Sequence, residues 1–411
     1  MSRRILLIGS ITGYQTRVFA EAARRLGHDV VLATDQCKKL DDPWGDHAIT
    51  VRFQHPEAYA RRLALEGPFD GVLAVGDHPT LLAAMTARRL GIPHNSPAAV
   101  EACRNKYLAR QLFQGAGLNV PAYFRIRLGE TSWPEPPFPC VLKPLGLSGS
   151  RGVIRANNPA EFSAALGRIA ALLENREIRR LKEEQNRYIQ VEAFIEGREF
   201  ALEGILTGGR LQVLALFDKP DPLDGPYFEE TIYVTPSRAE PEAQRAIAAT
   251  TQRAIEALGL TRGPVHVEMR VNARGVWMLE VAARPIGGLC ARALRFLPDM
   301  PLEELILRHA AGEDISGARR ASPAAGVMMI PIPKGGIYRD VAGLDEARAT
   351  PGIEDVVITA TPGQKLVPLP EGSSYLGFIF ARGDTPGSVE IALREAHAKL
   401  SFEIAGELKV I

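Results

Sequence analysis

The chain has 411 residues, 24% of them charged, and a formal net charge of +1. A chain of this length can bury large cores and is expected to hold two or three domains. The nearly neutral balance gives no electrostatic argument for binding nucleic acid or an anionic membrane surface. Four scattered cysteines, none in a Cys-x-x-Cys pair, favour neither a zinc site nor a disulfide framework. We see no signal-peptide pattern and no apolar run of membrane-spanning length, and therefore expect a cytoplasmic protein.

Residues 1–95 have the pattern of a small α/β domain. The expected elements are strands at 5–8, 29–33 and 71–75 and an amphipathic helix at 14–26. Strands that alternate with helices predict a parallel sheet, so we expect a Rossmann-like domain. Asp77 and His78 follow the third strand, at the edge where such sheets bind ligands. For His78 a cap or surface position is the favoured interpretation.

The next segment contains two lysines in suggestive settings. Ser96-Pro97 is typical of an N-cap followed by proline at the first helical position, and Asn105-Lys106 opens a second helix. A short apolar strand at 138–144 carries Lys143 and runs directly into 145–153, which is rich in Gly and Ser. Such loops offer backbone N–H groups to phosphates, and a neighbouring lysine adds positive charge. The alternative is an ordinary turn with an exposed lysine.

The middle of the chain alternates helix, strands and loop. We expect one long charged helix over 159–186, then two strands at 188–200 separated by a break at Gly197. A hairpin should turn at Gly208-Gly209. Residues 219–236 hold many Pro, Gly and acidic residues and are expected to form a loop over the site.

The most informative segment is a predicted hairpin over 264–281. A three-residue loop with Gly275 in the left-handed conformation would place Glu268 opposite Glu280 on one face. Two facing carboxylates repel each other, and a shared divalent cation would remove that penalty. Two solvated glutamates are the alternative, and a two-residue loop would put them on opposite faces. The expected apolar sets are Val265, Val267, Met269 and Val271 in the first arm and Trp277, Leu279 and Val281 in the second.

The C-terminal part has the pattern of a separate domain that follows a linker. Residues 312–325 are rich in Gly, Ala, Arg and Ser and are expected to be a linker. The remainder, 325–411, is expected to be a small α+β domain. Its predicted elements are strands at 327–333, 356–359 and 375–381 and a last helix, capped by Thr385, that ends near residue 400.

Taken together and in order, these motifs resemble those of ATP-grasp enzymes. Glu-Ala-Phe-Ile-Glu-Gly-Arg-Glu-Phe at 192–200 is similar to the family's Glu-x-x-Leu/Ile-x-Gly-x-Glu-Phe hinge segment. Lys106, Lys143 and the loop 148–152 match its two lysines and phosphate lid, and the two hairpin glutamates match its metal ligands. The resemblance covers most of the chain, and four motifs in the right order are specific.

The resemblance implies a multidomain fold that mixes α/β and α+β units. An N-terminal Rossmann-like domain at 1–95 would precede an ATP-grasp domain pair at 96–312, with a flexible lid over about 122–192. The C-terminal domain at 325–411 resembles that of the L-amino-acid ligase branch, which forms dipeptides. A homodimer is expected because dimers are common in the family.

The resemblance also implies an ATP-dependent carboxylate–amine ligase. ATP would convert a carboxylate to an acyl phosphate, and an amine would then displace phosphate to form an amide. Small carboxylates and amines, above all L-amino acids, would be the substrates. The implied ATP contacts are Lys106, Lys143, Ser148, Gly149, Ser150, Glu192 at the adenine amino group, backbone atoms near Phe194 and Ile195, and Glu199 at the ribose. Mg²⁺, or alternatively Mn²⁺, would bind Glu268 and Glu280.

Further candidates surround the implied reaction centre. Arg284 follows Glu280 in a run similar to the family's Glu-x-Asn-x-Arg-x-x-Gly-Gly and would stabilise the transferring phosphoryl group. The implied substrate contacts are Glu230 (with Glu229 as the fallback), His266 and the backbone of Gly287 and Gly288, while Tyr233 would shape the pocket. For Glu230 an exposed loop position, and for His266 a structural hydrogen bond, are the alternatives.

One departure from the family pattern opens other readings. Ala282 stands where many ATP-grasp enzymes have an asparagine metal ligand. A non-catalytic ATP-binding module is therefore one alternative function. A purine-pathway or biotin-carboxylase-like ligase is another, and the C-terminal segment argues against it.

Overall fold

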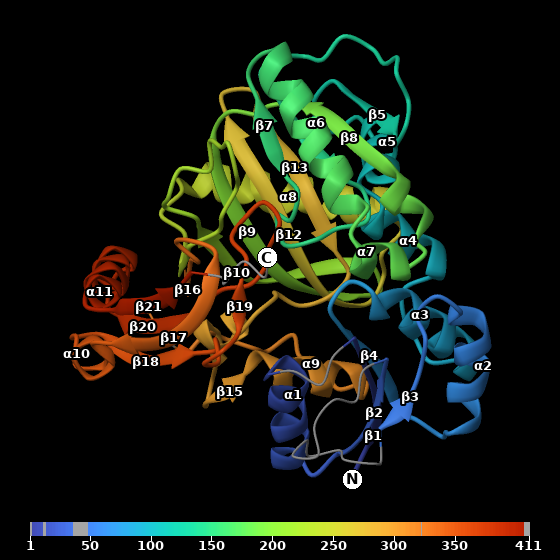
Figure 1. Ribbon diagram of the computed structural model, residues 1–411. Helices are drawn as coiled ribbons and strands as arrows, with labels where there is room; N and C mark the ends of the chain where they lie inside the picture. Colours follow the sequence, from blue (N-terminus) through green and yellow to red (C-terminus); the bar gives the residue numbers. More distant parts are fainter. Residues whose placement is uncertain (1, 11–13, 36–47, 322, 407–411) are drawn as a thin grey trace.

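The computed structural model describes residues 2–10, 14–35, 48–321 and 323–406. Figure 1 shows the N-terminal domain in blue at the bottom, the lid at the top and the C-terminal segment, orange to red, at the lower left. The sheet that connects them runs through the middle. The mixed multidomain fold expected from the sequence is confirmed.

The N-terminal domain is a four-stranded parallel sheet of order β3-β2-β1-β4. Its elements are β1 (Arg4–Gly9), α1 (Tyr14–Arg25), β2 (Asp29–Thr34), β3 (Ile49–Thr50), α2 (Pro56–Leu65), β4 (Gly71–Val75) and α3 (Pro79–Leu90). Strand β1 is apolar without alternation because both of its faces are covered. Ile5 and Leu7 pack into one hydrophobic cluster, and Leu6 and Ile8 into another. The predicted Rossmann-like parallel sheet is confirmed.

Two short helices, α4 (Pro97–Arg104) and α5 (Lys106–Gly115), lead from this domain to the lid. Both predicted caps are confirmed. The Ser96 hydroxyl accepts a hydrogen bond from the backbone N–H of Ala99, and the Asn105 side chain accepts two at the start of α5. The second cap places Lys106 at the first position of its helix.

The lid is an antiparallel sheet of order β5-β8-β6-β7 with helices against one face. Its elements are β5 (Tyr123–Arg127), β6 (Cys140–Pro144), β7 (Ile154–Ala156), α6 (Pro159–Leu173), α7 (Arg176–Arg180), the 3₁₀ turn η2 (Glu184–Arg187) and β8 (Tyr188–Ala193). The prediction of one helix over 159–186 is wrong. The Asn175 side chain accepts from the backbone N–H of Glu177 and so starts a new helix instead of continuing α6.

An eight-stranded antiparallel sheet forms the middle of the molecule, in the order β13-β12-β9-β10-β11-β16-β20-β18. Its strands are β9 (Arg198–Thr207), β10 (Arg210–Asp218), β11 (Ile232–Thr235), β12 (Gly263–Asn272), β13 (Gly275–Ala282), β16 (Ala324–Ile330), β18 (Ile353–Ile358) and β20 (Gly377–Gly383). Helix α8 (Pro241–Leu258) covers one face of the first strands. The segment 219–236, expected to be all loop, contains β11, which joins the two halves of this sheet.

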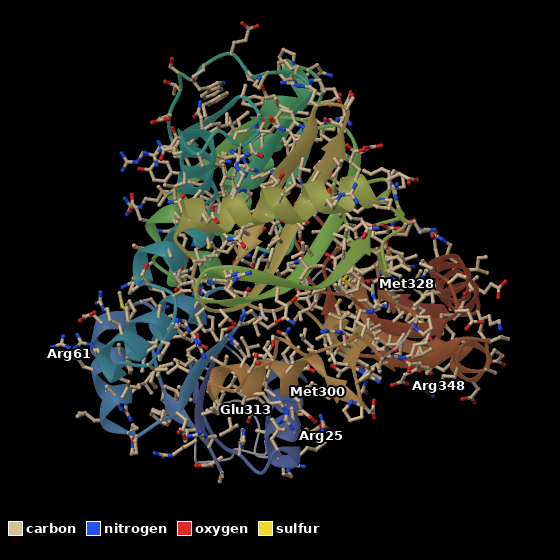
Figure 2. All side chains as sticks on the ribbon, turned by 180° about the vertical axis from the view of Figure 1, so that it is seen from behind. Arg25, Arg61, Met300, Glu313, Met328 and Arg348 are labelled. Carbon is tan, nitrogen blue, oxygen red and sulfur yellow. The ribbon has the colours of Figure 1, made fainter. Side chains whose placement is uncertain are left out.

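The remaining elements complete the C-terminal half. They are η3 (Cys290–Ala293), β14 (Arg295–Phe296), β15 (Met300–Pro301), α9 (Leu302–Ala310), β17 (Gly336–Ala342), α10 (Leu344–Arg348), β19 (Lys365–Leu366), α11 (Pro386–Ala398) and β21 (Ser401–Ala405). Thr385 caps α11, as predicted. Helix α9 packs against α1, where Arg25 and Glu304 form an ion pair at 2.5 Å. Seen from behind in Figure 2, Arg25 lies beside the segment that carries Met300.

The hairpin of β12 and β13 places Glu268 opposite Glu280, as predicted, but by a different route. Asn272 pairs with Gly275, so the loop has two residues and not three. Beyond the pair Met269–Met278, strand β13 has one extra residue, Leu279. This β-bulge brings Glu280 back opposite Glu268. The bulge also turns Leu279 toward the site, away from the buried cluster that holds Met278 and Val281. The apolar set expected for the second arm is therefore wrong.

Two smaller expectations can be compared with the structure. In the described part of the chain, no helix is both long and apolar enough to cross a membrane. Cys103, Cys140 and Cys290 are free thiols, and Cys140 is buried in the lid. Cys37 lies outside the described residues.

Candidate active site

A cavity of about 460 Å³ lies where the lid, the large sheet and the C-terminal segment meet, a size typical of small-molecule sites. The structure brings every primary candidate from the sequence to its walls, whereas the fallback Glu229 is not among the lining residues. These residues are Lys106, Lys143, Ser148, Gly149, Ser150, Glu192, Phe194, Ile195, Glu199, Glu230, His266, Glu268, Glu280, Arg284, Gly287 and Gly288.

One corner of the cavity has the chemistry of a phosphate site. Lys106 donates a hydrogen bond to the carbonyl of Leu147 at 2.8 Å, which ties α5 to the Gly/Ser loop. In that loop Gly149 and Ser150 both adopt left-handed backbone conformations, with φ of 63° and 54°. Ser150 is a non-glycine residue in this region, so the loop is held in a strained shape. Ser148, Gly149 and Ser150 line the cavity, and backbone N–H groups in such turns can bind phosphate.

Lys143 reaches the same corner from β6 and pairs with Glu192 at 2.6 Å. Glu192 is almost completely buried and also pairs with Arg110 at 2.6 Å. Burial alone would raise the pKa of Glu192, but Arg110 and Lys143 outweigh it and lower the value to about 2. The Gln190 side chain donates to the same carboxylate. Both oxygens of Glu192 are thus engaged by protein groups, and its charge holds Lys143 in place.

The hinge between lid and sheet also lines the cavity. Phe194 is covered by two guanidinium groups, Arg155 at 4.1 Å and Arg270 at 4.9 Å from the ring centre. Arg270 also donates to the carbonyl of Ile195 at 2.6 Å and to Glu199 at 2.9 Å. This one arginine therefore fixes the hinge backbone and the carboxylate expected at the ribose.

Lys219, which the sequence analysis missed, lies among three carboxylates. Its ammonium is 2.9 Å from Glu199 and 3.5 Å from Glu268, and it forms a hydrogen bond with Glu230. Only 3% of its side chain is exposed. Burial disfavours its charge, yet the three carboxylates raise the pKa of Lys219. The oxygens of these glutamates lie within 4.8 Å of one another, but the ammonium of Lys219 already contacts all three.

The facing pair Glu268 and Glu280 is a better fit to a divalent cation. Glu280 lines the cavity, is half-buried, and makes no hydrogen bond or ion pair within the ranges that the structure describes. A half-buried carboxylate without a protein partner, opposite a second carboxylate, is the donor set that hard cations take. The residues present therefore fit a metal ion between the two strands.

His266 holds one member of this pair, Glu268, in place. It bridges Glu203 at 2.7 Å and Glu268 at 3.2 Å. Burial lowers the pKa of His266, but the two carboxylates outweigh it and raise the value to about 9. His266 therefore has the structural hydrogen bonds that were its alternative interpretation. Ala282 is its cross-strand partner, so the small residue noted in the sequence lies opposite this histidine.

Arg284 enters the cavity from the segment after β13 and is oriented by the N-terminal domain. Asp77, just after β4, accepts from its Nε at 2.9 Å and from a terminal nitrogen at 3.1 Å. A third N–H goes to the carbonyl of Pro285. Because a guanidinium has five N–H groups, two remain for a ligand. Burial disfavours the charge of Arg284, but Asp77 outweighs it and raises the pKa of Arg284.

Another part of the cavity wall carries aromatic and apolar side chains. Tyr233, Met329 and Phe378 line it, and Gly288 lies against the Phe378 ring. Residues of the C-terminal segment, including Ser373, were not anticipated. No sequence motif around these residues indicates a site. For Lys219 there was a signal, because Lys-Pro directly follows the strand that ends at Asp218.

Comparisons with known proteins agree with this geometry. A family model described as an ATP-grasp domain matches residues 136–293. An ATP-grasp N-terminal domain matches residues 20–94, and L-amino acid ligase C-terminal domain 2 matches residues 328–405. The three matches follow the order of the segments described above.

Individual relatives point the same way. The crystal structure of L-amino acid ligase from Bacillus licheniformis superimposes with a TM-score of 0.84 at 26% identity, covering 98% of this chain and 99% of that one. A protein of Sinorhizobium fredii without an assigned activity is 25% identical over 98% of this chain and 84% of its own length. The alanine–anticapsin ligase of Bacillus subtilis is 27% identical over 50% of this chain, which spans 46% of that ligase.

The chain therefore belongs to the ATP-grasp superfamily, and it is an ATP-grasp ligase similar to the L-amino acid ligases.

Proposed function

We propose that this ligase joins a carboxylate to an amine through an acyl phosphate, with an L-amino acid as a substrate and ADP and phosphate as products. The observation that carries the proposal is a single cavity that holds a phosphate corner, a facing carboxylate pair and Arg284. Phosphoryl transfer needs positioning and charge neutralisation rather than covalent chemistry by the protein. The three features supply these two requirements within one site.

In the first step Lys106, Lys143 and the backbone N–H groups of the loop 148–150 would hold the ATP phosphates. Glu199 would accept from the ribose. Glu268 and Glu280 would hold Mg²⁺, which would supply positive charge to balance that of the ATP phosphates. An oxygen of the substrate carboxylate attacks the γ-phosphorus of ATP. The bond between the γ-phosphorus and the β-phosphate oxygen breaks, ADP leaves, and an acyl phosphate forms. The two unengaged N–H groups of Arg284 would stabilise charge on the transferring group.

In the second step a neutral amine attacks the acyl carbon and phosphate leaves. An amino acid arrives as an ammonium ion and must lose a proton first. Burial and the neighbouring Glu268 raise the pKa of Glu230 despite its contact with Lys219, which suits Glu230 to bind the amine and accept that proton. Backbone N–H groups at Gly287 and Gly288 would orient the carboxylate substrate. We assign Glu192 to holding Lys143 rather than to adenine alone, since both of its oxygens are engaged.

Two observations rank the alternatives. The match of residues 328–405 to the L-amino acid ligase C-terminal domain favours an amino-acid ligase over a purine-pathway or biotin-carboxylase-like enzyme. Ala282 removes one ligand of the family pattern, but Glu268 and Glu280 still face each other and His266 holds Glu268 in place, which disfavours a non-catalytic module. The expected homodimer and the cytoplasmic location stay predictions.

The test is ADP release with Mg²⁺-ATP across a matrix of paired amino acids and small carboxylates, with mass spectrometry of the products. We expect one pair to give ADP together with a new amide, and Glu280→Gln to abolish both while the protein stays folded. ADP without an amide would indicate an acyl phosphate that lacks its amine. Unchanged product formation in Glu280→Gln and Lys143→Ala would show that the site assignment is wrong.

A further inference from the structure

The C-terminal segment contributes more than a wall to the cavity. After β19 the chain forms a loop, residues 367–376, that rises from the C-terminal sheet toward the lid (Figure 1). Here we call it the clamp loop. It contacts the lid at two places that are far from it in sequence. One is helix α6, and the other is the Gly/Ser-rich loop 145–153, called the phosphate loop below. Two separate sets of contacts connect it with the lid.

The first set acts on the phosphate loop itself. The backbone N–H of Gly152 donates to the carbonyl of Pro370 at 2.7 Å, and the side chain of Arg151 donates to the carbonyl of Glu371 at 2.6 Å. These bonds lie directly after Ser150, the residue with the left-handed backbone. A strained conformation persists only when its surroundings hold it, and here another domain adds to the turn hydrogen bonds of the loop itself.

The second set acts on the body of the lid. The Glu371 carboxylate forms a two-pronged pair with Arg168 on α6, at 2.5 and 2.9 Å. Arg168 also donates to the hydroxyl of Tyr227, which belongs to the loop before β11. Arg168 therefore connects the lid with two loops of the opposite wall. Both members of the pair are more than a third exposed, so this contact can open and close in water.

We propose that Glu371 and Arg168 are positioning residues that hold the phosphate loop in its nucleotide-binding shape from the C-terminal domain. An exposed ion pair contributes little to folding, but here it joins two parts that must separate for nucleotide exchange. The small free energy of this ion pair then affects the affinity for nucleotide rather than the free energy of unfolding of the whole protein. This inference rests on the nucleotide site proposed above but not on the identity of either substrate.

The test exchanges the two charges. In Arg168→Glu and in Glu371→Arg, like charges face each other and push the lid away from the clamp loop. The double variant Arg168→Glu/Glu371→Arg restores an opposite pair at the same place. As a matched control, the same exchange is made at Arg308 and Glu313, an ion pair of 2.9 Å with similar exposure on the far side of the molecule from the lid.

Two readouts keep this inference separate from the proposed function. Without nucleotide, amide exchange of the 148–153 segment should rise in each single variant and return toward wild type in the double variant. With nucleotide, the KM for ATP should rise roughly three- to tenfold in the single variants and recover in the double, with kcat and melting temperature little changed.

The outcomes are distinct. Single and double variants that all match wild type in both readouts, as the Arg308/Glu313 variants should, would overturn the inference. So would a double variant as impaired as the singles. If wild type binds no ATP while the amide-exchange pattern holds, the proposed function fails and the loop restraint remains.

Discussion

At the scale of single residues, the site depends on charged groups that act through other charged groups. Arg284 is held by Asp77 from a different domain, in a two-pronged contact that fixes the plane of the guanidinium. Asp77 itself is not among the residues that line the cavity. Its contribution is therefore to the direction in which Arg284 points.

We predict that Asp77→Asn slows catalysis more than it weakens ATP binding. Asparagine keeps the shape but loses the charge and one acceptor, so Arg284 would no longer be held in one orientation. Misplaced catalytic groups typically cost roughly tenfold to a hundredfold in rate. We expect kcat to fall by that order in steady-state assays and the KM for ATP to change less.

The matched control is Asp70→Asn, because Asp70 pairs with Arg3 at 2.9 Å in the same domain but away from the cavity. It should leave the kinetics unchanged. A kcat for Asp77→Asn equal to that of wild type would mean that Arg284 needs no orienting partner.

Lys219 is the second residue whose partners define its role. Its ammonium separates Glu199, Glu230 and Glu268, which would otherwise repel one another in a buried place. Removing one member of a buried ionic group leaves uncompensated charge and commonly costs about 3–5 kcal/mol. We predict a loss of that order in the free energy of unfolding of Lys219→Met, measured by urea denaturation in the presence of a chelator.

The same variant should become more responsive to divalent cations. Its three carboxylates, with oxygens within 4.8 Å of one another, would form a ligand set for Mg²⁺ or Ca²⁺ once the lysine is gone. Either ion should raise its melting temperature more than that of wild type or of Lys334→Met, a substitution at an exposed lysine. An equal response in all three proteins would refute this description of the cluster.

At the scale of elements, local sequence patterns predicted strands and helix caps well. The register of the β12–β13 hairpin was predicted correctly, but for the wrong reason. Asn105 and Ser96 cap their helices because a capping bond is made within a few residues. The hairpin glutamates face each other only because a two-residue loop and a bulge compensate for one another. A bulge depends on the neighbouring strands, so the alternation within one strand cannot reveal it.

Long-range contacts set the limit of sequence reasoning about the site. The candidates that lie in motifs, such as Lys143 and Glu268, all line the cavity. The partners that hold site residues were not predicted: Arg110 reaches Glu192 across 82 positions, and Asp77, noted only for its place after a strand, reaches Arg284 across 207. Likewise, the charged pattern of 159–186 did not reveal that Asn175 would start a new helix. Partner choice at such distances depends on the whole fold.

At the scale of the whole molecule, the C-terminal segment and the ATP-grasp segment share one sheet and one core. Strand β16 pairs with β11, and β20 and β18 continue beyond it. Phe378 and Phe380 of β20 belong to the same hydrophobic cluster as Ile5 of β1 and Phe217 of β10. The N-terminal domain, the large sheet and the C-terminal segment therefore contribute to one core, whereas the lid has a separate one.

This shared core predicts that the C-terminal segment cannot be removed. A chain ending at residue 323 would lose β16 and expose the hydrogen-bonding edge of β11, which invites pairing between molecules. It would also lose buried side chains such as Val327, Phe378 and Phe380, each contributing about 1.5–3 kcal/mol when fully buried. We expect this truncated protein to aggregate in size-exclusion chromatography with light scattering, where the full chain elutes as a discrete species. A truncated protein that stays discrete and unfolds cooperatively would show that the ATP-grasp part has a sufficient core of its own, and the continuous sheet would then be a contact between two independent domains.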